Sequence, residues 1–493
     1  MILSDLINGI QVTKSIGSGE LNISGISIDS KKVEKGFLFV ALKGEKTDGH
    51  KYIESAVSNG ASAVIAEKTP DVELSGVTVV EVPDSRAALA GVSAIFYAHP
   101  TKELSLVGIT GTNGKTTITY LLESIWRQES LKSAVLGTID YRYGGNKVQS
   151  LMTTPESLDL MRMFREMRNS GVEIAAMEVS SHALDKKRVM GCHFDAAVFT
   201  NLTQDHLDYH GTIENYLNTK KALFTDVLKN SEKERKFSII NLDDPYGNEI
   251  IKDAEGEVVT YSAHDRGAGV FAESSEITEH GIRARVITPA GALDINSKLY
   301  GAHNLSNLLA AAATAVSLGS SIDSVEKGLS AAEVIPGRLE SVDNTLGIKV
   351  LVDYAHTPDA LENVLRAARP LTAGNLILVF GCGGDRDTTK RPKMGLIGKE
   401  LSDILLVTSD NPRTESSEKI IDDIEKGVLE GAGSKKPYFR VSDRKEAILR
   451  AISMADNGDT VLIAGKGHED YQIIGTKKYP FDDRIIAGDA LRE

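Results

Sequence analysis

Apolar runs of strand length alternate with amphipathic segments of helix length over most of the chain. Strands that alternate with helices in this way indicate a mostly parallel sheet covered on both faces, and therefore an α/β fold. In the middle of the chain, the runs expected to form buried strands are 104–109, 133–136, 174–179, 196–200 and 237–241. Shorter alternating strands are expected over 257–300, with helices at 304–318 and 324–332.

The same rhythm divides the chain into three expected domains. Residues 1–98 hold strand-like runs at 37–42 and 63–66, and His99-Pro100 reads as a linker. A second strand–helix series begins at Pro336-Gly337 and indicates a doubly wound C-terminal domain. Its expected elements are strands at 349–352, 376–380, 404–408 and 460–464, with helices at 358–368, after Ser417 and at 444–455. The expected domains are therefore 1–98, 99–335 and 336–493.

Composition narrows the class of protein. The chain has 493 residues, enough for roughly two to four domains, and a formal net charge of −13. An acidic chain is a poor general binder of nucleic acid, which requires basic surface. The two cysteines, Cys192 and Cys382, allow no disulfide framework and fit a reducing cytoplasm. No signal peptide and no membrane-spanning run are expected.

Residues 110–117 read TGTNGKTT and follow directly on an apolar run. Gly111 and Gly114 allow backbone N–H groups to approach phosphate oxygens, because glycine has no side chain to obstruct them. Lys115 can reach the β- and γ-phosphates of a nucleotide, and the Thr116 hydroxyl can bind Mg²⁺. The pattern therefore predicts a phosphate-binding loop between a strand and a helix. The alternative is a glycine-rich turn that only joins these two elements.

Three further features of the middle region could act on a bound phosphate. Glu178 ends an apolar run, where a carboxylate could bind Mg²⁺ or face solvent. The segment 200–212, TNLTQDHLDYHGT, concentrates acidic residues and histidines, among them His206. It could be a polar loop, a zinc site, or a Mg²⁺ or Mn²⁺ site. Lys220 lies about one helical turn after Tyr216 and by itself reads as an exposed helix lysine.

Polar clusters also follow the strands expected in the C-terminal domain. Arg338 comes after a Pro-Gly turn and Asp353 ends a strand, so both could hold the phosphate and ribose of a nucleotide. The other candidates are Arg386 in GCGGDRD, residues 410–413 (DNPR) and residues 465–472 (GKGHEDYQ). Each cluster alone could be a structural turn. Together, at the carboxyl ends of parallel strands, they indicate a binding site for a small zwitterion.

These segments together resemble the Mur ligase family of peptidoglycan synthesis over essentially the whole chain. The motifs that carry the resemblance are TGTNGKTT, MEVSSH, TNLTQDHLDYHG, HNLSN, DYAHTPD, DNPR and GKGHEDYQ. The general phosphate-loop pattern requires glycine where this chain has Ile109, and the family's loop also lacks that glycine. The resemblance implies a UDP-substrate-binding domain, a central P-loop ATPase and a C-terminal Rossmann-like domain.

The resemblance also implies an ATP-dependent amide ligation. ATP would phosphorylate the free D-Glu carboxylate of UDP-MurNAc-L-Ala-D-Glu, and the amine of meso-diaminopimelate would then displace phosphate. A carboxylate is a poor electrophile until phosphorylation supplies a leaving group. Mg²⁺, expected at two sites, and Lys115 would stabilise the charge that develops. The expected protein is a cytoplasmic monomer without nucleic-acid or membrane partners.

The family motifs imply a role for each matching residue. The expected catalytic residues are Lys115, Glu178, His206 and Lys220. The expected ATP-binding residues are Gly111, Thr112, Asn113, Gly114, Lys115, Thr116, Thr117, Asn304, Arg338 and Asp353. The expected metal ligands are Thr116, Glu178, His206 and Lys220, the last as a carbamate (N6-carboxylysine). The UDP-substrate contacts are expected at Ser30, Thr153, Thr154, Ser180, Lys186 and Arg188. The diaminopimelate contacts are expected at Arg386, Asp410, Asn411, Pro412, Arg413, Gly465 and Glu469.

The expected amino acid is meso-diaminopimelate rather than L-lysine. Diaminopimelate carries a distal carboxylate, for which Arg413 offers a bidentate guanidinium, while Asn411 and Glu469 can meet the distal ammonium. Lysine would set an ammonium against Arg413, which is a repulsive mismatch.

Two positions among the UDP-substrate contacts depart from the family pattern. Lys186 stands where relatives often have glutamine, and Met152 stands where some have asparagine.

Several other functions remain alternatives at this point. The nearest are the same reaction with L-lysine, and another Mur or folylpolyglutamate-type ligase. A phosphate-loop switch or motor is a different class, and it would not require His206 and Lys220 or a second α/β domain. A catalytically inactive binding protein is disfavoured because the expected catalytic and metal-binding residues are all present: Lys115, Thr116, Glu178, His206 and Lys220.

Overall fold

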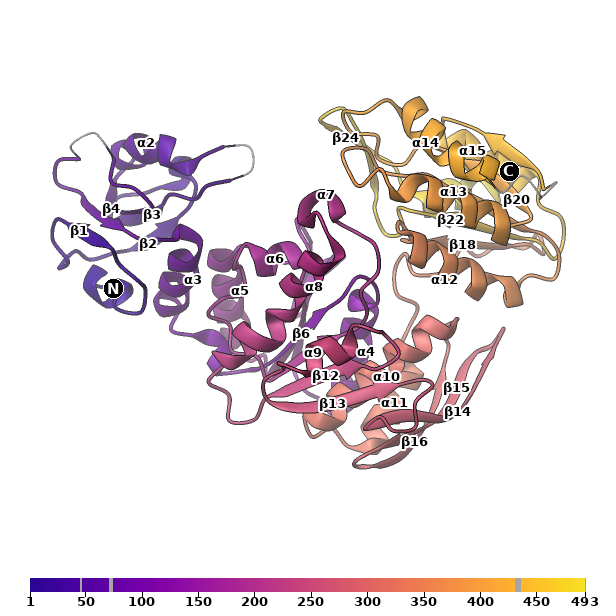
Figure 1. Ribbon diagram of the computed structural model, residues 1–493, viewed down its shortest axis with the longest axis horizontal. Helices are drawn as coiled ribbons and strands as arrows, with labels where there is room; N and C mark the ends of the chain where they lie inside the picture. Colours follow the sequence, from indigo (N-terminus) through magenta and orange to yellow (C-terminus); the bar gives the residue numbers. More distant parts are fainter. Residues whose placement is uncertain (45–46, 71–73, 431–435, 493) are drawn as a thin grey trace.

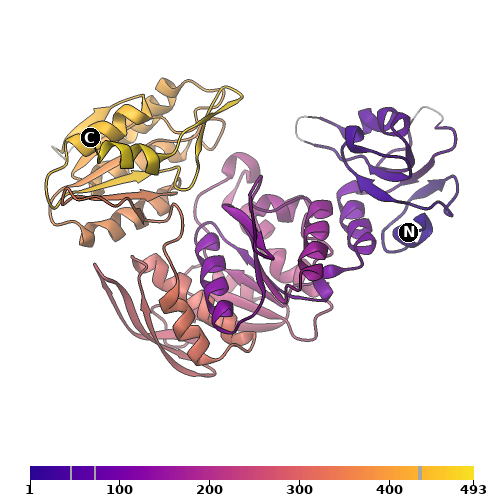
Figure 2. The same cartoon turned by 180° about the vertical axis from the view of Figure 1, so that it is seen from behind.

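The computed structural model of the protein describes residues 1–44, 47–70, 74–430 and 436–492. The chain forms α/β lobes in sequence order, with the central lobe between an N-terminal and a C-terminal lobe (Figure 1). The view from behind shows the same arc (Figure 2). In the part of the chain that the structure describes, no sheet pairs strands across residues 98–99 or 335–336, so we propose these positions as domain boundaries. The expected α/β fold with mostly parallel strands is confirmed.

The N-terminal sheet has the order β1-β5-β4-β3-β2 and is parallel except at β1. The runs expected at 37–42 and 63–66 correspond to β3 and β4. Strand β1 has no apolar pattern to predict it, because all of its residues are exposed. The elements of this lobe are α1 (Leu3–Ile7), β1 (Lys14–Ile16), β2 (Gly25–Ser27), β3 (Phe37–Val40), α2 (Ile53–Ser58), β4 (Ala61–Ala66), β5 (Thr78–Glu81) and α3 (Ser85–Phe96).

The expected linker after this lobe is a fixed turn. Ala98 and His99 both adopt left-handed backbone conformations, with φ of 56° and 49°. Non-glycine residues adopt this region only when surrounding contacts impose it. Here Arg165 on α5 (Ser157–Asn169) donates from Nε to the Tyr97 carbonyl and from Nη2 to the Ala98 carbonyl, both at 3.0 Å. The turn is therefore held against the central lobe.

The central sheet has the order β16-β15-β14-β13-β12-β11-β6-β10-β7-β8-β9. Neighbouring strands are parallel from β14 to β7, and antiparallel hairpins extend both edges. The strands over 257–300 are longer than expected. The elements are β6 (Ser105–Thr110), α4 (Lys115–Gln128), β7 (Ser133–Leu136), β8 (Asp140–Tyr143), β9 (Asn146–Gln149), α5, β10 (Ile174–Glu178), α6 (Ser181–Asp185), β11 (Ala196–Phe199), α7 (Leu207–His210), α8 (Ile213–Lys221), β12 (Phe237–Asn241), α9 (Gly247–Ile251), β13 (Glu257–Ser262), β14 (Val270–Thr278), β15 (Gly281–Thr288), β16 (Gly291–Ser297), α10 (Ala302–Ser317) and α11 (Ile322–Ala331).

Helices cover both faces of the central sheet, which explains why its parallel strands are apolar throughout. Every residue of β10 and of β12 is buried. Helices α4, α10 and α11 contribute apolar residues to the core on one face, and α5, α6 and α8 to the core on the other. Trp126, the only tryptophan in the sequence, is fully buried on α4. This packing fixes α4, and with it the end of the phosphate-binding loop.

The C-terminal sheet has the order β17-β18-β22-β19-β20-β21 and is parallel except at β17. The expected doubly wound arrangement is present, but sequence reasoning missed α13. Among the described residues, no helix combines the length and apolar character needed to cross a membrane. The elements are β17 (Glu340–Ser341), β18 (Lys349–Asp353), α12 (Pro358–Ala368), β19 (Leu376–Phe380), α13 (Lys390–Leu401), β20 (Ile404–Val407), α14 (Ser417–Glu430), β21 (Tyr438–Arg440), α15 (Arg444–Ser453), β22 (Thr460–Ala464), β23 (Tyr471–Ile474), β24 (Lys477–Pro480) and α16 (Asp483–Ala490).

Helix α11 is in backbone contact with α4, the helix that follows the phosphate-binding loop. A Cβ atom at Gly328 on α11 would lie 2.4 Å from the Ile125 Cα. The Ser124 hydroxyl also donates to the Gly328 carbonyl at 2.7 Å. Because the obstructing atoms belong to the backbone, a side chain at position 328 would have to displace α4.

We predict that Gly328→Ala lowers the free energy of unfolding by about 1–3 kcal/mol, the usual effect of overpacking. Thermal unfolding followed by circular dichroism and by Trp126 fluorescence measures this change. Gly488→Ala on α16 is the matched control, because the atom nearest to its added Cβ is Val342 Cγ1 at 3.8 Å. There alanine should raise the stability by up to about 1 kcal/mol through its helix propensity. Equal shifts in the two variants would contradict the packing argument.

Candidate active site

The predicted phosphate-binding loop, residues 110–117 (hereafter the phosphate-binding loop), connects the end of β6 to the first turn of α4. Gly111 and Gly114 have φ of 148° and 88°, a region that favours glycine. An added Cβ would lie 1.8 Å from the Thr200 hydroxyl oxygen at Gly111, and 2.3 Å from Asn307 Oδ1 at Gly114. The loop is therefore enclosed by the end of β11 and by α10. Its position at a helix N-terminus favours an anion.

Two lysines donate to one carbonyl of this loop. Lys115 Nζ donates to the carbonyl oxygens of Gly111 and Thr112, both at 2.8 Å, and Lys220 Nζ donates to the Gly111 carbonyl at 2.9 Å. The Lys220 side chain on α8 is 1% exposed, so the interpretation as an exposed helix lysine is wrong. Burial, and then the charge of Lys115, lower the pKa of Lys220. Both amines are thus held beside the predicted phosphate site.

The Tyr216 ring organises the surroundings of Lys220. Lys220 Nζ lies 4.4 Å from the centre of this ring, and the Tyr216 hydroxyl lies 3.4 Å from Thr112 Oγ1. His210 stacks on the ring at 5.0 Å, and His206 meets it edge-on at 6.2 Å. Burial lowers the pKa of His206 to about 3. His206 is therefore a neutral imidazole, the form that can bind a metal ion.

Glu178 joins the phosphate-binding loop to a second loop. It ends β10 and is 1% exposed. Its Oε1 accepts from the Thr116 hydroxyl and from the Thr138 backbone N–H, both at 2.8 Å, and its Oε2 accepts from the Thr138 hydroxyl at 2.9 Å. Thr138 Oγ1 lies 3.1 Å from Thr153 Oγ1, so the chain of contacts reaches an expected UDP-substrate residue. Sequence reasoning missed Thr138, which lies in no motif.

Thr116, Glu178, His206 and Lys220 are the expected metal ligands. Across the described residues, no group of three or more His, Cys, Asp or Glu side chains is arranged to hold a metal ion. Mg²⁺, however, commonly binds through one or two carboxylates together with waters and substrate phosphates. The contact between the Thr116 hydroxyl and the Glu178 carboxylate suits that mode. The residues present therefore fit a Mg²⁺ ion that binds together with a nucleotide.

Side chains of the C-terminal lobe contact this site directly. Arg338 Nη2 donates to Thr116 Oγ1 at 3.3 Å. Asp205 Oδ2 lies 3.7 Å from His356 Nε2, and Asp205 Oδ1 lies 3.6 Å from Lys390 Nζ. Burial raises the pKa of Asp205, but His356 and Lys390 outweigh it and bring the value well below normal. The ionised Asp205 thus ties the central lobe to its neighbour.

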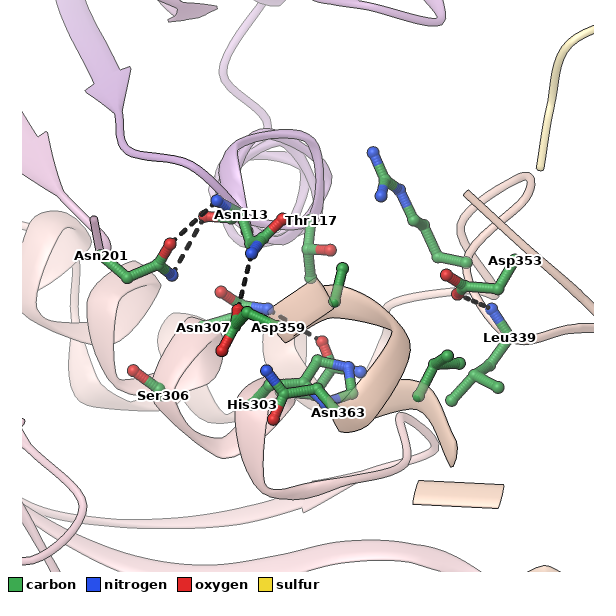
Figure 3. Close-up of a pocket in the computed structure, with 15 residues that line it drawn as sticks. Asn113, Thr117, Asn201, His303, Ser306, Asn307, Leu339, Asp353, Asp359 and Asn363 are labelled. Atoms are coloured by element: carbon green, nitrogen blue, oxygen red, sulfur yellow. Dashed lines mark hydrogen bonds between the residues drawn. The ribbon is translucent and has the colours of Figure 1, made fainter. Parts of the chain in front are cut away.

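A cavity of about 110 Å³ lies beside the phosphate-binding loop, between α10 and the start of α12 (Figure 3). Asn113 Nδ2 donates across it to Asp359 Oδ2 at 2.8 Å, so both lobes enclose the cavity. Sequence reasoning missed Asp359, and it missed His303 and Asn307, although both lie in the HNLSN motif. The expected nucleotide residues that line the cavity are Asn113, Gly114, Thr117, Asn304, Arg338 and Asp353.

Most expected UDP-substrate residues lie together in the central lobe. Thr154 Oγ1 donates to the Glu178 carbonyl at 2.9 Å and accepts from the Ser180 backbone N–H at 3.1 Å. Arg188 Nη1 donates to the Thr154 carbonyl at 3.1 Å. Lys186 follows directly on α6, and its Nζ lies 5.6 Å from the centre of the Tyr209 ring. The remaining residue, Ser30, is buried in the N-terminal lobe.

The expected amino-acid residues follow the ends of β19, β20 and β22: Arg386 comes after β19, residues 410–413 after β20, and Gly465 and Glu469 after β22. Asn411 Nδ2 donates to Glu469 Oε2 at 2.9 Å, which brings the DNPR and GKGHEDYQ motifs together. Gly465 is required here, because it has φ of 118° and an added Cβ would lie 2.6 Å from Asp410 Oδ2. The fully buried Lys466, which sequence reasoning missed, donates to both Glu469 Oε2 and Asn411 Oδ1 at 3.2 Å.

Arg413 sits at the edge of the same group. Its backbone is left-handed, with φ of 52°, and its Nη1 donates to the Gly384 carbonyl at 2.7 Å. Burial, and then the neighbouring Arg386, lower the pKa of Arg413. The two guanidinium groups therefore repel each other, and an anion between them would relieve that repulsion. The Pro412 carbonyl would lie 1.9 Å from a Cβ at Gly384, so the two loops touch through their backbones.

A second cavity, of about 150 Å³, joins these groups. Thr138 and Thr153 line it from the central lobe, and His468 and Glu469 line it from the C-terminal lobe. The contacts of Thr138 lead to Glu178 and the phosphate-binding loop, while those of Glu469 lead to Asn411. The fold and site thus define an α/β protein with a predicted phosphate-binding loop, in which a cavity joins the predicted nucleotide site to a second predicted binding site.

Known proteins match the chain along its length. Profiles described as Mur ligase family catalytic domain, Mur ligase middle domain, and Mur ligase glutamate ligase domain match residues 22–97, 109–315 and 337–467. The UDP-N-acetylmuramoyl-L-alanyl-D-glutamate–2,6-diaminopimelate ligase of Geobacter metallireducens is 47% identical over 100% of this chain and 99% of its own. That of Geobacillus kaustophilus is 45% identical over 96% of each chain.

Solved structures agree with this assignment. A UDP-N-acetylmuramoyl-L-alanyl-D-glutamate–2,6-diaminopimelate ligase superposes with a TM-score of 0.70 at 32% identity, over 100% of this chain and 99% of its own. A D-alanyl-D-alanyl-adding ligase from Acinetobacter baumannii shares the fold, with a TM-score of 0.63 at 20% identity over 94% and 95% of the two chains. The chain belongs to the Mur ligase family, whose members are ATP-dependent amide ligases.

We predict that Glu178→Gln weakens the binding of magnesium nucleotide by about tenfold or more, because an amide can present an N–H to the donors that now meet a carboxylate. Isothermal titration with Mg²⁺ and ADP measures the change. Glu173→Gln is the matched control, because Glu173 lies just before the other end of the same strand and is exposed. A comparable loss in both variants would place the effect in the strand rather than in the nucleotide site.

Proposed function

We propose that this chain joins meso-diaminopimelate to the D-Glu carboxylate of UDP-MurNAc-L-Ala-D-Glu and converts ATP to ADP and phosphate. The observation that carries the proposal is the cavity lined by Thr138 and Thr153 on one side and Glu469 on the other. This cavity connects the predicted phosphate and UDP-substrate sites to the predicted amino-acid site. The relatives named as diaminopimelate-adding ligases support the same assignment.

The first step makes the carboxylate reactive. An oxygen of the D-Glu carboxylate attacks the γ-phosphorus of ATP, the bond from that phosphorus to the ADP oxygen breaks, and an acyl phosphate forms. Lys115, released from the loop carbonyls that it contacts in this structure, would stabilise the charge on the transferring phosphoryl group. Thr116 and Glu178 would hold a Mg²⁺ ion, which would neutralise part of the phosphate charge when it is bound.

The second step forms the amide. The uncharged amine of the amino acid attacks the acyl carbon, the bond from carbon to the phosphate oxygen breaks, and inorganic phosphate leaves with the electron pair. The nitrogen gives up its extra proton to the departing phosphate as the tetrahedral intermediate collapses. Asn411 and Glu469 would hold the ammonium at the far end of the amino acid, and Arg413 its distal carboxylate. These contacts direct the reacting amine toward the central lobe.

The UDP-muramyl dipeptide would lie between the N-terminal and central lobes. Ser30 comes from the first lobe, whereas Thr153, Thr154, Ser180, Lys186 and Arg188 come from the second. Arg188 and Arg86 both pair with Glu156, at 2.8 and 3.4 Å, so a charged network already joins the two lobes. We propose that the enzyme acts as a cytoplasmic monomer and uses a second Mg²⁺ near His206.

We further propose that Lys220 works as a carbamate. The Lys220 ammonium would lose one proton to solvent, and the resulting neutral amine would add to the carbon of CO₂ and release a second proton. A cation is thereby replaced by an anionic oxygen ligand. The side chain is buried beside the Gly111 carbonyl, so in the unmodified state it places a cationic group next to Lys115. The carbamate would remove this repulsion and bind the second Mg²⁺ together with His206.

We predict that Lys220→Ala abolishes ligation while the thermal midpoint of unfolding stays close to that of the wild type. Coupled release of ADP measures the activity. Lys221→Ala is the matched control, because Lys221 is the next residue of the same helix and pairs with Asp253 instead. Added acetate, which supplies a free carboxylate, should restore part of the activity to Lys220→Ala. Near-normal activity in that variant without acetate would rule the role out.

We also predict that the enzyme uses meso-diaminopimelate with a kcat/KM about a hundredfold or more above that for L-lysine, because lysine leaves Arg413 without an anion. Release of ADP should require both the UDP-muramyl dipeptide and the amino acid. Arg413→Met should reduce the ratio of the two kcat/KM values, because it should lower only the kcat/KM for diaminopimelate. Equal or better turnover with L-lysine would contradict the predicted specificity for diaminopimelate. Release of ADP in the absence of both the UDP-muramyl dipeptide and the amino acid would favour a phosphate-loop switch.

A further inference from the structure

Arg391 is a buried cation that the proposed mechanism does not use. It lies on α13 and is 1% exposed. Helices α13 and α14 enclose it, because their backbones are in contact: a Cβ at Gly395 would lie 2.1 Å from the Ile424 carbonyl oxygen, and one at Gly427 would lie 1.7 Å from the Pro392 carbonyl oxygen. A guanidinium in such a place needs a partner for its charge.

The partners of Arg391 come from two segments. Its Nη2 and Nη1 donate to the two carboxylate oxygens of Glu415 at 2.8 and 3.0 Å, which is a bidentate pair. Nη1 also donates to Asp423 Oδ2 at 3.0 Å. The remaining bond runs from Nη2 to the Gly383 carbonyl at 3.2 Å. Arg391 therefore holds the loop after β19 to the segment that follows the DNPR motif.

The loop after β19 carries Arg386 and supports Arg413. The Gly383 carbonyl binds Arg391, and the carbonyl of the next residue, Gly384, accepts from Arg413 Nη1. In the same loop the Asp385 backbone N–H donates to Glu415 Oε1 at 2.5 Å. One buried guanidinium thus fixes the peptide beside the carbonyl that holds the Arg413 guanidinium.

The Asp385 side chain adds further contacts between the loop after β19 and the segment that follows Arg413. Its carboxylate accepts from the Thr414 hydroxyl at 2.8 Å and from the Thr414 backbone N–H at 3.2 Å. The Gly384 backbone N–H also donates to the Asn411 carbonyl at 2.9 Å, so the two loops are cross-linked both before and after Arg413. These contacts restrain Arg413, whose pKa is lowered by burial and then by the charge of Arg386, and raised by the nearby carboxylates Asp410, Glu469 and Asp385.

We infer that Arg391 is a positioning residue for the distal carboxylate of the amino acid, acting through Glu415 and the Gly383–Gly384 peptide on Arg413 and Arg386. This inference rests on the proposed function. It assigns the selectivity for a dicarboxylic amino acid to a residue that does not touch the substrate. A bidentate contact to a carboxylate depends on the orientation of the guanidinium, so a small displacement of its support weakens that contact specifically.

The test compares two amino acids on the full-length enzyme. Arg391→Met should lower kcat/KM for meso-diaminopimelate by about tenfold or more, mainly through KM, because the positions of Arg413 and Arg386 are lost. The value for L-lysine should change by less than about threefold, because lysine has no distal carboxylate for those residues to bind. Arg391→Lys should recover only part of the loss, because an ammonium cannot hold Glu415 bidentately and reach the Gly383 carbonyl as well.

Arg440→Met is the matched control. Arg440 lies on β21 and also pairs with carboxylates of α14, but on the exposed side of that helix. Its partners are Glu418, Asp422 and Glu425. Its removal should leave the ratio of the two kcat/KM values unchanged. If Arg391→Met does not fold, Arg391→Lys and Glu415→Gln carry the same comparison, with the thermal midpoint recorded for each.

The outcomes separate the inference from the proposed function. A parallel fall for both amino acids, together with a lower thermal midpoint, would show a purely structural role and overturn the inference. An unchanged KM for meso-diaminopimelate would overturn it as well. If lysine turnover is too slow to measure, a rise in KM for meso-diaminopimelate with unchanged KM for ATP and the UDP-muramyl dipeptide supports it. Absence of ligation by the wild-type enzyme would instead contradict the proposed function.

Discussion

The buried carboxylate of Glu178 is the contact on which the arrangement of the site depends. A carboxylate taken out of water must find donors, and here the donors come from two segments, at Thr116 and Thr138. The first lies in the phosphate-binding loop and the second leads to Thr153. The relative position of the predicted nucleotide and UDP-substrate residues is therefore set by the hydrogen bonds that one buried carboxylate requires. Strand β10 holds that carboxylate in place through its pairing with β6 and β7.

The central and C-terminal lobes meet through contacts of another kind. Arg338 reaches Thr116, Asn113 reaches Asp359, and Asp205 lies between His356 and Lys390. These are polar contacts, and polar contacts between lobes are readily exchanged for water when the lobes separate. The same contacts surround the predicted nucleotide site. Binding of a nucleotide and separation of the lobes are therefore expected to be coupled, as in other enzymes that close around a substrate.

Features that depend on residues close together in the sequence could be predicted, whereas contacts between residues far apart in the sequence could not. Strand β6, helix α4 and the glycines between them are encoded locally, and the structure has them where the motif predicts. Lys220 was predictable only through the resemblance, because nothing in its own helix indicates that it is buried. Thr138 and Arg391 carry no local signal at all. Their partners lie 40 and 24 residues away, and only the fold brings them together.

The chain has a net charge of −13, yet each predicted ligand is an anion or carries carboxylates. Some of the cations that would bind them act on one another: Lys115 and Lys220 donate to the same carbonyl, and the charge of Arg386 lowers the pKa of Arg413. Like charges at such distances stay in place only if other groups hold them there. Buried pairs such as Arg391 with Glu415 supply that restraint, because a charge enclosed with its counter-ion cannot move without losing the bonds that compensate its desolvation. Selectivity at the predicted amino-acid site is therefore expected to depend on buried ion pairs as much as on the residues that face the cavity.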